Sequence, residues 1–448
     1  MYITYWLLVK CLGDNCGVSV GGACYSPGGL KVIIPVGGRA TRLLPLTFET
    51  SKACLRLLNR PLVEFSLLSL ASQGIRHIIF GVKGYTNYRD LYDYFGSGYG
   101  FSERYSIEPR LHIDYQPNIS DLGSADSARI NLEYYDLKGD VFVVQGDNLF
   151  DVNIKSLMDF HRARDAALTI VLREVDDIEG LGLVDIDKAG RINRFVEKPL
   201  PKDAPSNLAN TGLYVMSSKV RQIFKEEFIQ QLIKDKKRLD FGYDFIPYII
   251  QSGFPVYGYT IKGHWFDVGT PQNYLEAMKS LLQQSVVMPP DFGEYLQPNS
   301  NCLVWVQEDN NTSVKCREQI LQKIKQKKIH VNGAVLIGRH CQIEDGATLT
   351  NCCLDNFTQI GKNVVVSNSA LMDKVVIGDY AEVTDSIIGR HVTISSSQQA
   401  PTKISDVSVI ADDVTIDEGS RLSASKVYPH QKVVGEFVNQ VFPASFKL

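Results

Sequence analysis

The chain has 448 residues, of which 44% are hydrophobic and 22% charged, and its formal net charge is −3. This length predicts two or three domains, and the composition is that of an ordinary folded protein. The near-neutral charge excludes a global basic field that would recruit nucleic acid or an anionic membrane, whereas a phosphate-bearing small ligand needs only a local positive cluster.

Residues 1–30 contain many glycines and three cysteines but no clear hydrophobic period. The first stretch, "MYITYWLLVK", has no basic residue before its apolar run and is interrupted by Lys10, so it makes a poor signal peptide. We expect a poorly ordered extension, or an over-long start with the true beginning near Leu30 or Lys31.

Residues 31–283 alternate between strand and helix patterns. The short apolar runs "KVIIPV", "HIIFGV" and "VFVVQGDN" are typical of buried parallel strands. Between them, "RPLVEFSLLSLASQG" has a proline near its start and a glycine past its end, and "YTNYRDLYDYF" follows the second run, so both predict helices. The alternation predicts an α/β, Rossmann-like domain, with a mostly parallel sheet and helices on both faces.

Ligands of such sheets bind outside the carboxyl ends of the strands. The stretch "VGGRATRLLPLTFETSK" (36–52) follows the first predicted strand, and "QGDN" (145–148) ends the third. We therefore expect these two stretches to meet in space, although they are far apart in the sequence.

Residues 284–330 differ in character from the domain before them. The proline-bearing stretch "VVMPPDFGEYLQPNSN" predicts an irregular linker. After it, "REQILQKIKQKK" (317–328) predicts a short basic helix whose charges form a solvated face.

A seventeen-residue repeat occupies residues 331–435. Its aliphatic residues recur in steps of six, six and five, at Ile337, Ile343, Leu349, Leu354, Ile360, Val366, Leu371, Ile377, Val383, Ile388 and Ile394. A loop, "SSSQQAPTK", interrupts the rhythm, which resumes at Ile404, Ile410, Ile416 and Leu422. The period is too short for a helical repeat and predicts a β-helix, with one aliphatic residue per side pointing inward.

The small residues after the first strand suit a phosphate-binding turn. Gly37, Gly38 and Ala40 let backbone N–H groups approach a polyphosphate closely, and Arg42 adds a bidentate donor for phosphate oxygens. A glycine turn alone is also common as a purely structural turn.

Five motifs, in order, resemble those of sugar-1-phosphate nucleotidyltransferases. "GGRATRLLPLTFETSK" is similar to the family signature G-G-x-G-T-R-L-x-P-L-T-x-x-x-P-K, and "QGDN", "FVEKP", "NTGLYV" and "GHWFDVGTPQNY" match the family in type and order. The resemblance extends from residue 31 to about residue 425 and implies that the repeat is a left-handed β-helix of hexapeptide repeats. Two residues depart from the signature: Ala40 replaces a glycine, and Ser51 replaces the proline before Lys52.

The resemblance implies attack of a sugar-phosphate oxygen on the α-phosphorus of a nucleoside triphosphate, with release of pyrophosphate. Two anions must then be aligned and their charge offset, for which Mg²⁺ held by carboxylates is the natural agent. Asp147 and Asp267 match the family's two metal-binding aspartates. Each could instead form a turn or cap a helix.

The same resemblance assigns the other site residues. Lys198 matches the lysine that contacts the sugar phosphate, and Lys52 and Arg42 match phosphate-contacting residues of the active site. The nucleotide would be bound by Gly37, Gly38, Ala40 and Thr41 and, at the base edge, by Gln116 and Gly123. The sugar would be bound by Gly146, Glu197, Asn210, Thr211 and Gly212, of which the last three could instead form an ordinary turn before the strand "LYVM".

Two alternatives remain open at this point. A non-catalytic regulatory subunit could keep the fold, although Arg42, Lys52, Asp147, Lys198 and Asp267 are all present. A bifunctional enzyme could carry an acetyltransferase site in the β-helix, with His340 and His391 as general bases.

Nine cysteines without a Cys-x-x-Cys pair indicate neither a zinc site nor a disulfide framework. No apolar run reaches transmembrane length. We therefore expect a cytoplasmic protein without a membrane or nucleic-acid partner, whose exposed coil edges favour a homo-oligomer.

Overall fold

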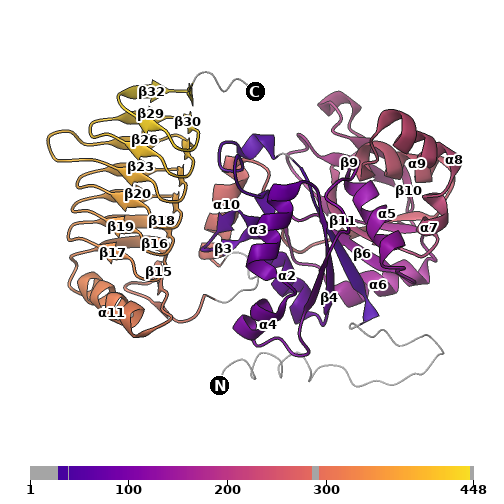
Figure 1. The fold of residues 1–448 in the computed structure, drawn as a ribbon, viewed down its shortest axis with the longest axis horizontal. Coiled ribbons are helices and arrows are strands. Elements are labelled where there is room, and N and C mark those ends of the chain that lie inside the picture. The colour runs from indigo at the N-terminus through magenta and orange to yellow at the C-terminus, as the bar shows by residue number, and fades with distance from the viewer. Residues whose placement is uncertain (1–28, 39, 285–291, 444–448) are drawn as a thin grey trace.

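The computed structural model describes residues 29–38, 40–284 and 292–443, so nearly all of the predicted N-terminal extension lies outside the described residues. An α/β domain is followed by a stack of short strands, and the helix α10 (Pro271–Leu282) faces that stack (Figure 1). Within the described ranges, no helix is long and apolar enough to cross a membrane.

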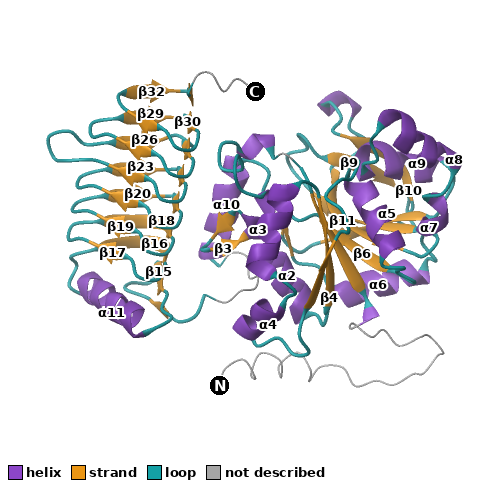
Figure 2. Cartoon of the chain, in the orientation of Figure 1, coloured by secondary structure: helices purple, strands orange, loops and turns teal. Residues whose placement is uncertain are grey.

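The sheet of the α/β domain has the strand order β10-β9-β11-β6-β1-β4-β5, with β8 beside β11 and β12 beside β8. Figure 2 shows the strands of this domain in orange among purple helices. Its strands β1, β4, β5 and β6 are mutually parallel, whereas β11 runs antiparallel to β6. The strands are β1 (Lys31–Val36), β4 (His77–Val82), β5 (His112–Tyr115), β6 (Val141–Val144), β8 (Leu168–Glu174), β9 (Gly182–Ile186), β10 (Ile192–Glu197), β11 (Leu208–Met216) and β12 (Val256–Ile261).

Helices cover both faces of this sheet, which confirms the predicted α/β class. Side chains alternate along β1, so Val32 and Ile34 pack into one apolar core and Ile33 into the other. The first core includes α2 (Leu62–Ser72), α3 (Tyr85–Phe95), α4 (Tyr99–Tyr105) and α6 (Ile154–Ala163). The second includes α5 (Ser124–Tyr134), α7 (Val220–Ile223), α8 (Glu227–Gln231) and α9 (Ile246–Gln251).

The carboxyl ends of β1 and β6 lie beside each other, because Lys31–Ile33 pair in parallel with Val141–Val143. The glycine turn follows β1, and the "QGDN" residues connect β6 to β7 (Asn148–Phe150). β7 in turn pairs with β13 (Trp265–Asp267). The predicted meeting of the two motifs is thus confirmed.

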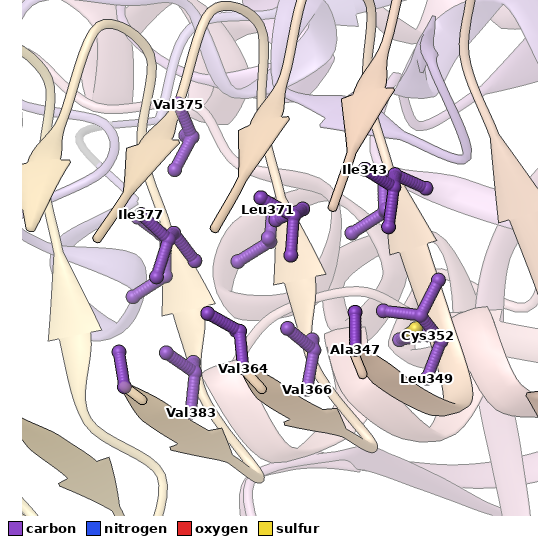
Figure 3. Close-up of a cluster of buried hydrophobic side chains, with 14 of the residues drawn as sticks. Ile343, Ala347, Leu349, Cys352, Val364, Val366, Leu371, Val375, Ile377 and Val383 are labelled. Atoms are coloured by element: carbon purple, nitrogen blue, oxygen red, sulfur yellow. The ribbon is translucent and has the colours of Figure 1, made fainter. Parts of the chain in front are cut away.

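The seventeen-residue repeat forms a parallel β-helix in which the predicted aliphatic residues stack. Ile343, Ile360, Ile377 and Ile394 are register partners in successive coils, and so are Leu354, Leu371 and Ile388. These side chains are buried in one apolar column, part of which Figure 3 shows. The interrupting loop adds its residues between β25 (Thr393–Ile394) and β26 (Lys403–Ser405), and the stack continues beyond it at Ile416 and Val433.

The strands of the stack are mostly two or three residues long. They are β16 (His330–Ile337), β17 (Gln342–Ile343), β18 (Thr348–Leu354), β19 (Gln359–Ile360), β20 (Val365–Ser367), β21 (Ala370–Leu371), β22 (Val376–Ile377), β23 (Glu382–Thr384), β24 (Ile387–Ile388), β25 (Thr393–Ile394), β26 (Lys403–Ser405), β27 (Val409–Ile410), β28 (Thr415–Ile416), β29 (Arg421–Ser423), β30 (Lys426–Val427), β31 (Lys432–Val433), β32 (Glu436–Val438) and β33 (Val441–Phe442).

The segment expected to be a linker contributes to the β-helix. β15 (Cys302–Val306) pairs in parallel with β16 and starts the stack, and β14 (Tyr295–Leu296) pairs with β15. The predicted basic helix is α11 (Asn311–Lys325), which begins earlier than expected because Asn310 and Ser313 form a capping box. Its Ile320 and Ile324 cover the end of the apolar column.

An apolar contact joins the two domains. Leu43 and Leu46 of the signature stretch belong to the same buried cluster as Ile387 and Val409 of the β-helix, and α10 contributes Met278. Arg56 of β2 (Arg56–Leu57), which forms a small hairpin with β3 (Arg60–Pro61), donates to both oxygens of the buried Asp355, which adds a charged contact to this cluster.

Candidate active site

A cleft of about 550 Å³ opens at the carboxyl ends of β1 and β6. It brings together segments that are far apart in the sequence, because β1, β6, β10, β11 and β13 all end or bend there. Most of the predicted site residues line it: Gly37, Gly38, Arg42, Gly123, Asp147, Glu197, Lys198, Asn210, Thr211, Gly212 and Asp267.

Asp147, Asp267 and Arg42 line the cleft, and Lys52, which is not among the lining residues, lies beside the two carboxylates. Asp267 pairs in register with Asn148, which places it next to Asp147. Lys52 donates to Asp147 at 2.5 Å and lies 3.8 Å from Asp267, and Arg42 lies 3.6 Å from Asp267. Burial raises the pKa of Asp267, and the nearby Asp147 carboxylate raises that pKa further.

This pair of aspartates fits a divalent cation. Burial and the Asp147 carboxylate both raise the pKa of Asp267, against the effect of Lys52, Arg42 and Lys198, so two acidic groups act on one another here. Carboxylate oxygens are the donors that Mg²⁺ prefers, and this ion is usually held by one or two carboxylates together with substrate phosphates. The residues of the site therefore fit the cation that the sequence predicts.

Glu197, the last residue of β10, and Lys198, which follows it, also line the cleft. Glu197 is held against two glycines, because an added Cβ at Gly242 or Gly182 would come within 2.2 or 2.7 Å of its Oε2 atom. Burial raises its pKa to about 6, and Lys198, at 3.9 Å, partly offsets the shift. Lys198 has a φ of 48°, and its ammonium lies 5.8 Å from the ring centre of Tyr243.

The Asn210–Gly212 segment lies inside β11 rather than in a turn before it. The ladder between β11 and β8 is irregular between Asn210 and Tyr214, and Gly212 has a φ of 76°. The Asn210 side chain accepts from the N–H of Gly212 and donates to Tyr214, while the Thr211 hydroxyl donates to Val171. The bulge re-aims these residues towards the cleft.

The glycine turn approaches its neighbours closely. A Cβ at Gly37 would come within 2.7 Å of Lys83, which explains why a residue without a side chain stands there. Ala40 has a φ of 46°, so the departure from the family signature places an alanine in the left-handed region. Ala40 and Thr41 do not line the cleft; Thr41 begins the short 3₁₀ helix η2 (Thr41–Leu43).

Gln116 and Gly146 lie behind the cleft wall. Gln116 is 4% exposed, donates to the Asn118 carbonyl and accepts from Ser127 and Asn131. Gly146 is packed against β1, because a Cβ there would come within 2.8 Å of Val36. Both residues shape the wall, and their predicted contacts with ligand stay predictions.

Several cleft residues were not foreseen from the sequence. Lys83, which follows β4 and lies 3.6 Å from Asp121, could have been found by the rule that ligands bind at strand carboxyl ends. Gln145, Arg238 and Tyr243 also line the cleft. Arg238 and Tyr243 come from a segment with no recognisable motif, so the sequence gives no signal for them.

Comparisons with known proteins show the family to which the chain belongs. The family described as "Nucleotidyl transferase" matches residues 31–284, and the "GMPPB C-terminal domain" matches residues 331–441. The chain is 27% identical over 394 residues to the UTP–glucose-1-phosphate uridylyltransferase of Synechocystis sp., covering 84% of this chain and 97% of that protein.

Two further relatives are similar to this chain over most of its length. The mannose-1-phosphate guanyltransferase of Pichia angusta is 25% identical over 411 residues, covering 90% of this chain and 97% of that protein. The glucose-1-phosphate adenylyltransferase of Fervidobacterium nodosum is 26% identical over 424 residues, covering 90% of this chain and 95% of that protein. Each similarity extends over both domains of this chain.

Proposed function

The chain belongs to the nucleotidyl transferase family, and we propose that it transfers a nucleoside monophosphate from an NTP to a hexose 1-phosphate, with Mg²⁺ as its cation and pyrophosphate as the second product. One observation carries the proposal: Asp147, Asp267 and Lys198 line one cleft, and the ammonium of Lys52 lies beside both aspartates. The family relatives named above act on glucose 1-phosphate or mannose 1-phosphate.

The residues divide the work between two phosphorylated substrates. The amides of Gly37 and Gly38 and the guanidinium of Arg42 bind the triphosphate. Lys198 binds the phosphate of the sugar, and Glu197 accepts hydrogen bonds from sugar hydroxyls. Held in line, an oxygen of the sugar phosphate attacks the α-phosphorus, and the bond to the pyrophosphate leaving group breaks.

The attacking oxygen is already anionic, so the protein needs no nucleophile of its own. Its task is to bring two anions together and to offset their charge. The ammonium of Lys52, which lies close to both aspartates, is the protein's own group for offsetting this charge. A bound Mg²⁺ ion, held by Asp147 and Asp267, would offset charge on the phosphate oxygens.

The two alternatives make different predictions. A regulatory subunit without activity has no need for the five charged residues, yet all five are present and cluster at one cleft. An acetyltransferase site would need an available base in the β-helix. His340 stacks on Phe357 at 4.8 Å and lies 3.4 Å from Asp309, and the Nδ1 atom of His391 lies 3.2 Å from Asp413. Neither contact removes the second ring nitrogen as a base, so the measurement of acetyl-CoA consumption decides this alternative.

Self-association is the remaining part of the proposal. The last coil ends with β32 and β33, beyond which the described chain adds no further strand to the stack. Val434, Val438 and Val441 are exposed there, with 61%, 58% and 41% of their surface accessible. Sedimentation of the purified chain should show a species larger than the 50.0 kDa monomer. A single monomer peak at micromolar concentration would refute self-association.

The experiment for the activity is a grid of substrates. The purified chain is incubated with Mg²⁺, each of UTP, dTTP, ATP and GTP, and glucose 1-phosphate or mannose 1-phosphate, and pyrophosphate is measured. We expect release in at least one combination and none when either substrate is omitted. Silence across the grid would favour the regulatory alternative, and acetyl-CoA consumption with an amino-sugar phosphate would support the bifunctional one.

A further inference from the structure

Two histidines and an aspartate converge at the end of the sheet opposite to the cleft. His77 is the first residue of β4 and His112 the first of β5, and the two are register partners in adjacent parallel strands. Asp114 lies two residues after His112 and therefore on the same face of β5. The cleft lies at the carboxyl ends of the strands, so this cluster is separate from it.

The donor atoms of the three side chains point to one place. The Nε2 atom of His77 lies 2.6 Å from one carboxylate oxygen of Asp114, and the Nε2 atom of His112 lies 3.3 Å from the other. All three donor atoms lie within 4.8 Å of one another. In a tetrahedral zinc site, bonds of about 2.0–2.1 Å put neighbouring donors roughly 3.3 Å apart, so small side-chain movements would seat a metal ion.

We propose that His77, His112 and Asp114 bind a divalent transition-metal ion such as Zn²⁺. Imidazole nitrogen and carboxylate oxygen are ligands that zinc accepts, and three protein ligands leave a fourth position for water. The side chain of His112 is 62% exposed, so solvent reaches this position. The ion would join β4 to β5, the edge strand of the sheet.

Equilibrium dialysis against Zn²⁺ with the metal-free full-length chain tests this site. The variants are His112→Ala and Asp114→Asn, and His330→Ala is the control, because His330 is also an exposed histidine at the start of a strand. We expect the wild type and the control to bind one more Zn²⁺ per chain than His112→Ala and Asp114→Asn, or to bind it at least about 10-fold more tightly.

Thermal unfolding gives a second readout of the same site. Zn²⁺ should raise the Tm of the wild type and of the control more than that of His112→Ala, because a ligand that binds the folded state stabilises it. Equal zinc stoichiometry, affinity and Tm shift in all four proteins would overturn the proposal and leave the cluster as a pair of ion pairs.

A second, independent observation concerns the chain between Arg42 and Lys52. Three consecutive residues of this segment contact the β-helix. The ring of Phe48 lies edge-on to that of Tyr428 at 5.3 Å, Glu49 lies 3.1 Å from His430, and the Thr50 hydroxyl accepts from Arg390 at 3.0 Å.

These contacts come from one corner of the β-helix. Arg390 follows β24, and Tyr428 and His430 follow β30, which lies two coils further along the same column of strands. Arg390 is fixed by Asp412, which accepts from its backbone N–H and from its side chain. The β-helix therefore offers a pre-arranged surface to a segment that carries a phosphate-binding residue at each end.

We infer that Arg390 is a positioning residue, which holds Thr50 and thereby Lys52 in place for the proposed nucleotidyl transfer. Ser51 joins Thr50 directly to Lys52, so a shift of Thr50 is transmitted to the ammonium beside Asp147. A misplacement of about 1 Å is enough to lower a rate by as much as 100-fold.

Steady-state kinetics of Arg390→Ala, Thr50→Val and the double variant test this inference, once a substrate pair active with wild type is known. The control, Lys403→Ala, removes an exposed ion pair to Glu382 elsewhere in the β-helix. We expect kcat to fall about 10-fold in each single variant without a matching rise in KM, the double variant to fall no further, and Thr50→Ser to keep the rate. Amide exchange of residues 47–52 should accelerate in Arg390→Ala.

Each outcome has a separate meaning. An inactive wild type would count against the proposed function rather than against this contact. An active wild type whose kcat is unchanged in Arg390→Ala, or losses that simply add in the double variant, would overturn the positioning role.

Discussion

Lys52 donates a 2.5 Å hydrogen bond to the carboxylate of Asp147, which lies between β6 and β7 and is far from Lys52 in the sequence. The lysine side chain is 14% exposed and that of the aspartate 33%, so the ion pair is mostly buried, with Asp147 as its more exposed member. Asp267 lies on the other side of the same ammonium. The proposed function depends on this arrangement of charge.

Asp147→Asn removes the charge and keeps the shape. We expect turnover to fall at least about 100-fold, because electrostatic groups aimed at reacting phosphates contribute effects of that size. Circular dichroism should show an unchanged fold. Asp151→Asn is the matched control, since Asp151 is an exposed aspartate directly after β7. Full activity in Asp147→Asn would refute the role of this carboxylate.

Glu197 makes stability depend on pH. Its pKa is raised from 4.5 to about 6 by burial, so the folded protein binds a proton there that the unfolded chain has already lost. The free energy of unfolding should therefore fall as pH rises from well below 4.5 to well above 6, by about 2 kcal/mol in total relative to Glu197→Gln, which cannot ionise. Urea unfolding of both proteins at several pH values measures the difference; parallel curves would contradict the burial effect.

Replacing Ala40 of the signature loop by glycine should stabilise the folded protein. Ala40 has a φ of 46°, where a Cβ costs about 1 kcal/mol, although glycine recovers only part of this because it also raises the entropy of the unfolded chain. Ala40→Gly should raise the free energy of unfolding by up to about 1 kcal/mol. The same change at the last residue of α6, Ala163→Gly, should instead lower it, by up to about 0.5 kcal/mol, because glycine is a poorer helix former than alanine. A lower free energy of unfolding in both variants would contradict backbone strain at Ala40.

Ser51 compensates for the missing proline of the signature. Its backbone N–H donates to Asp90 at 2.7 Å and its hydroxyl donates to Asn87 at 2.6 Å, which fastens the segment to α3. The φ of −57° suits proline, but proline has no N–H. Ser51→Pro should lower the free energy of unfolding by about 1–3 kcal/mol, and Ser51→Ala, which keeps the N–H, by less. Equal effects in chemical denaturation would show that the amide contributes nothing.

Regular patterns in the sequence predict the fold well. The spacing of Ile343, Ile360 and Ile377 predicts the inward stack, because each coil repeats the same requirement for one aliphatic residue per side. The sequence does not predict β15. Its residues, Cys302–Val306, lie before the repeat begins, and only the structure shows that they pair with the first strand of the repeat, β16.

The site is predictable where its residues belong to contiguous motifs. Asp147 and Asp267 are found in this way, although only the pairing of β7 with β13 shows that they are neighbours. Gln116 is buried behind the cleft, because Ser127 and Asn131 of α5 engage its side-chain oxygen, and no local pattern indicates that. Arg238 lies in a loop whose position depends on the packing of distant elements.

The most direct test of the central claim follows the phosphorus atoms. The active NTP is supplied with a radioactive label either at its α- or at its γ-phosphate, together with the hexose 1-phosphate and Mg²⁺. The account predicts that the α label appears in the sugar nucleotide and the γ label in pyrophosphate. Transfer of the γ label to the sugar, or recovery of the α label only in free nucleotide, would contradict nucleotidyl transfer at this cleft.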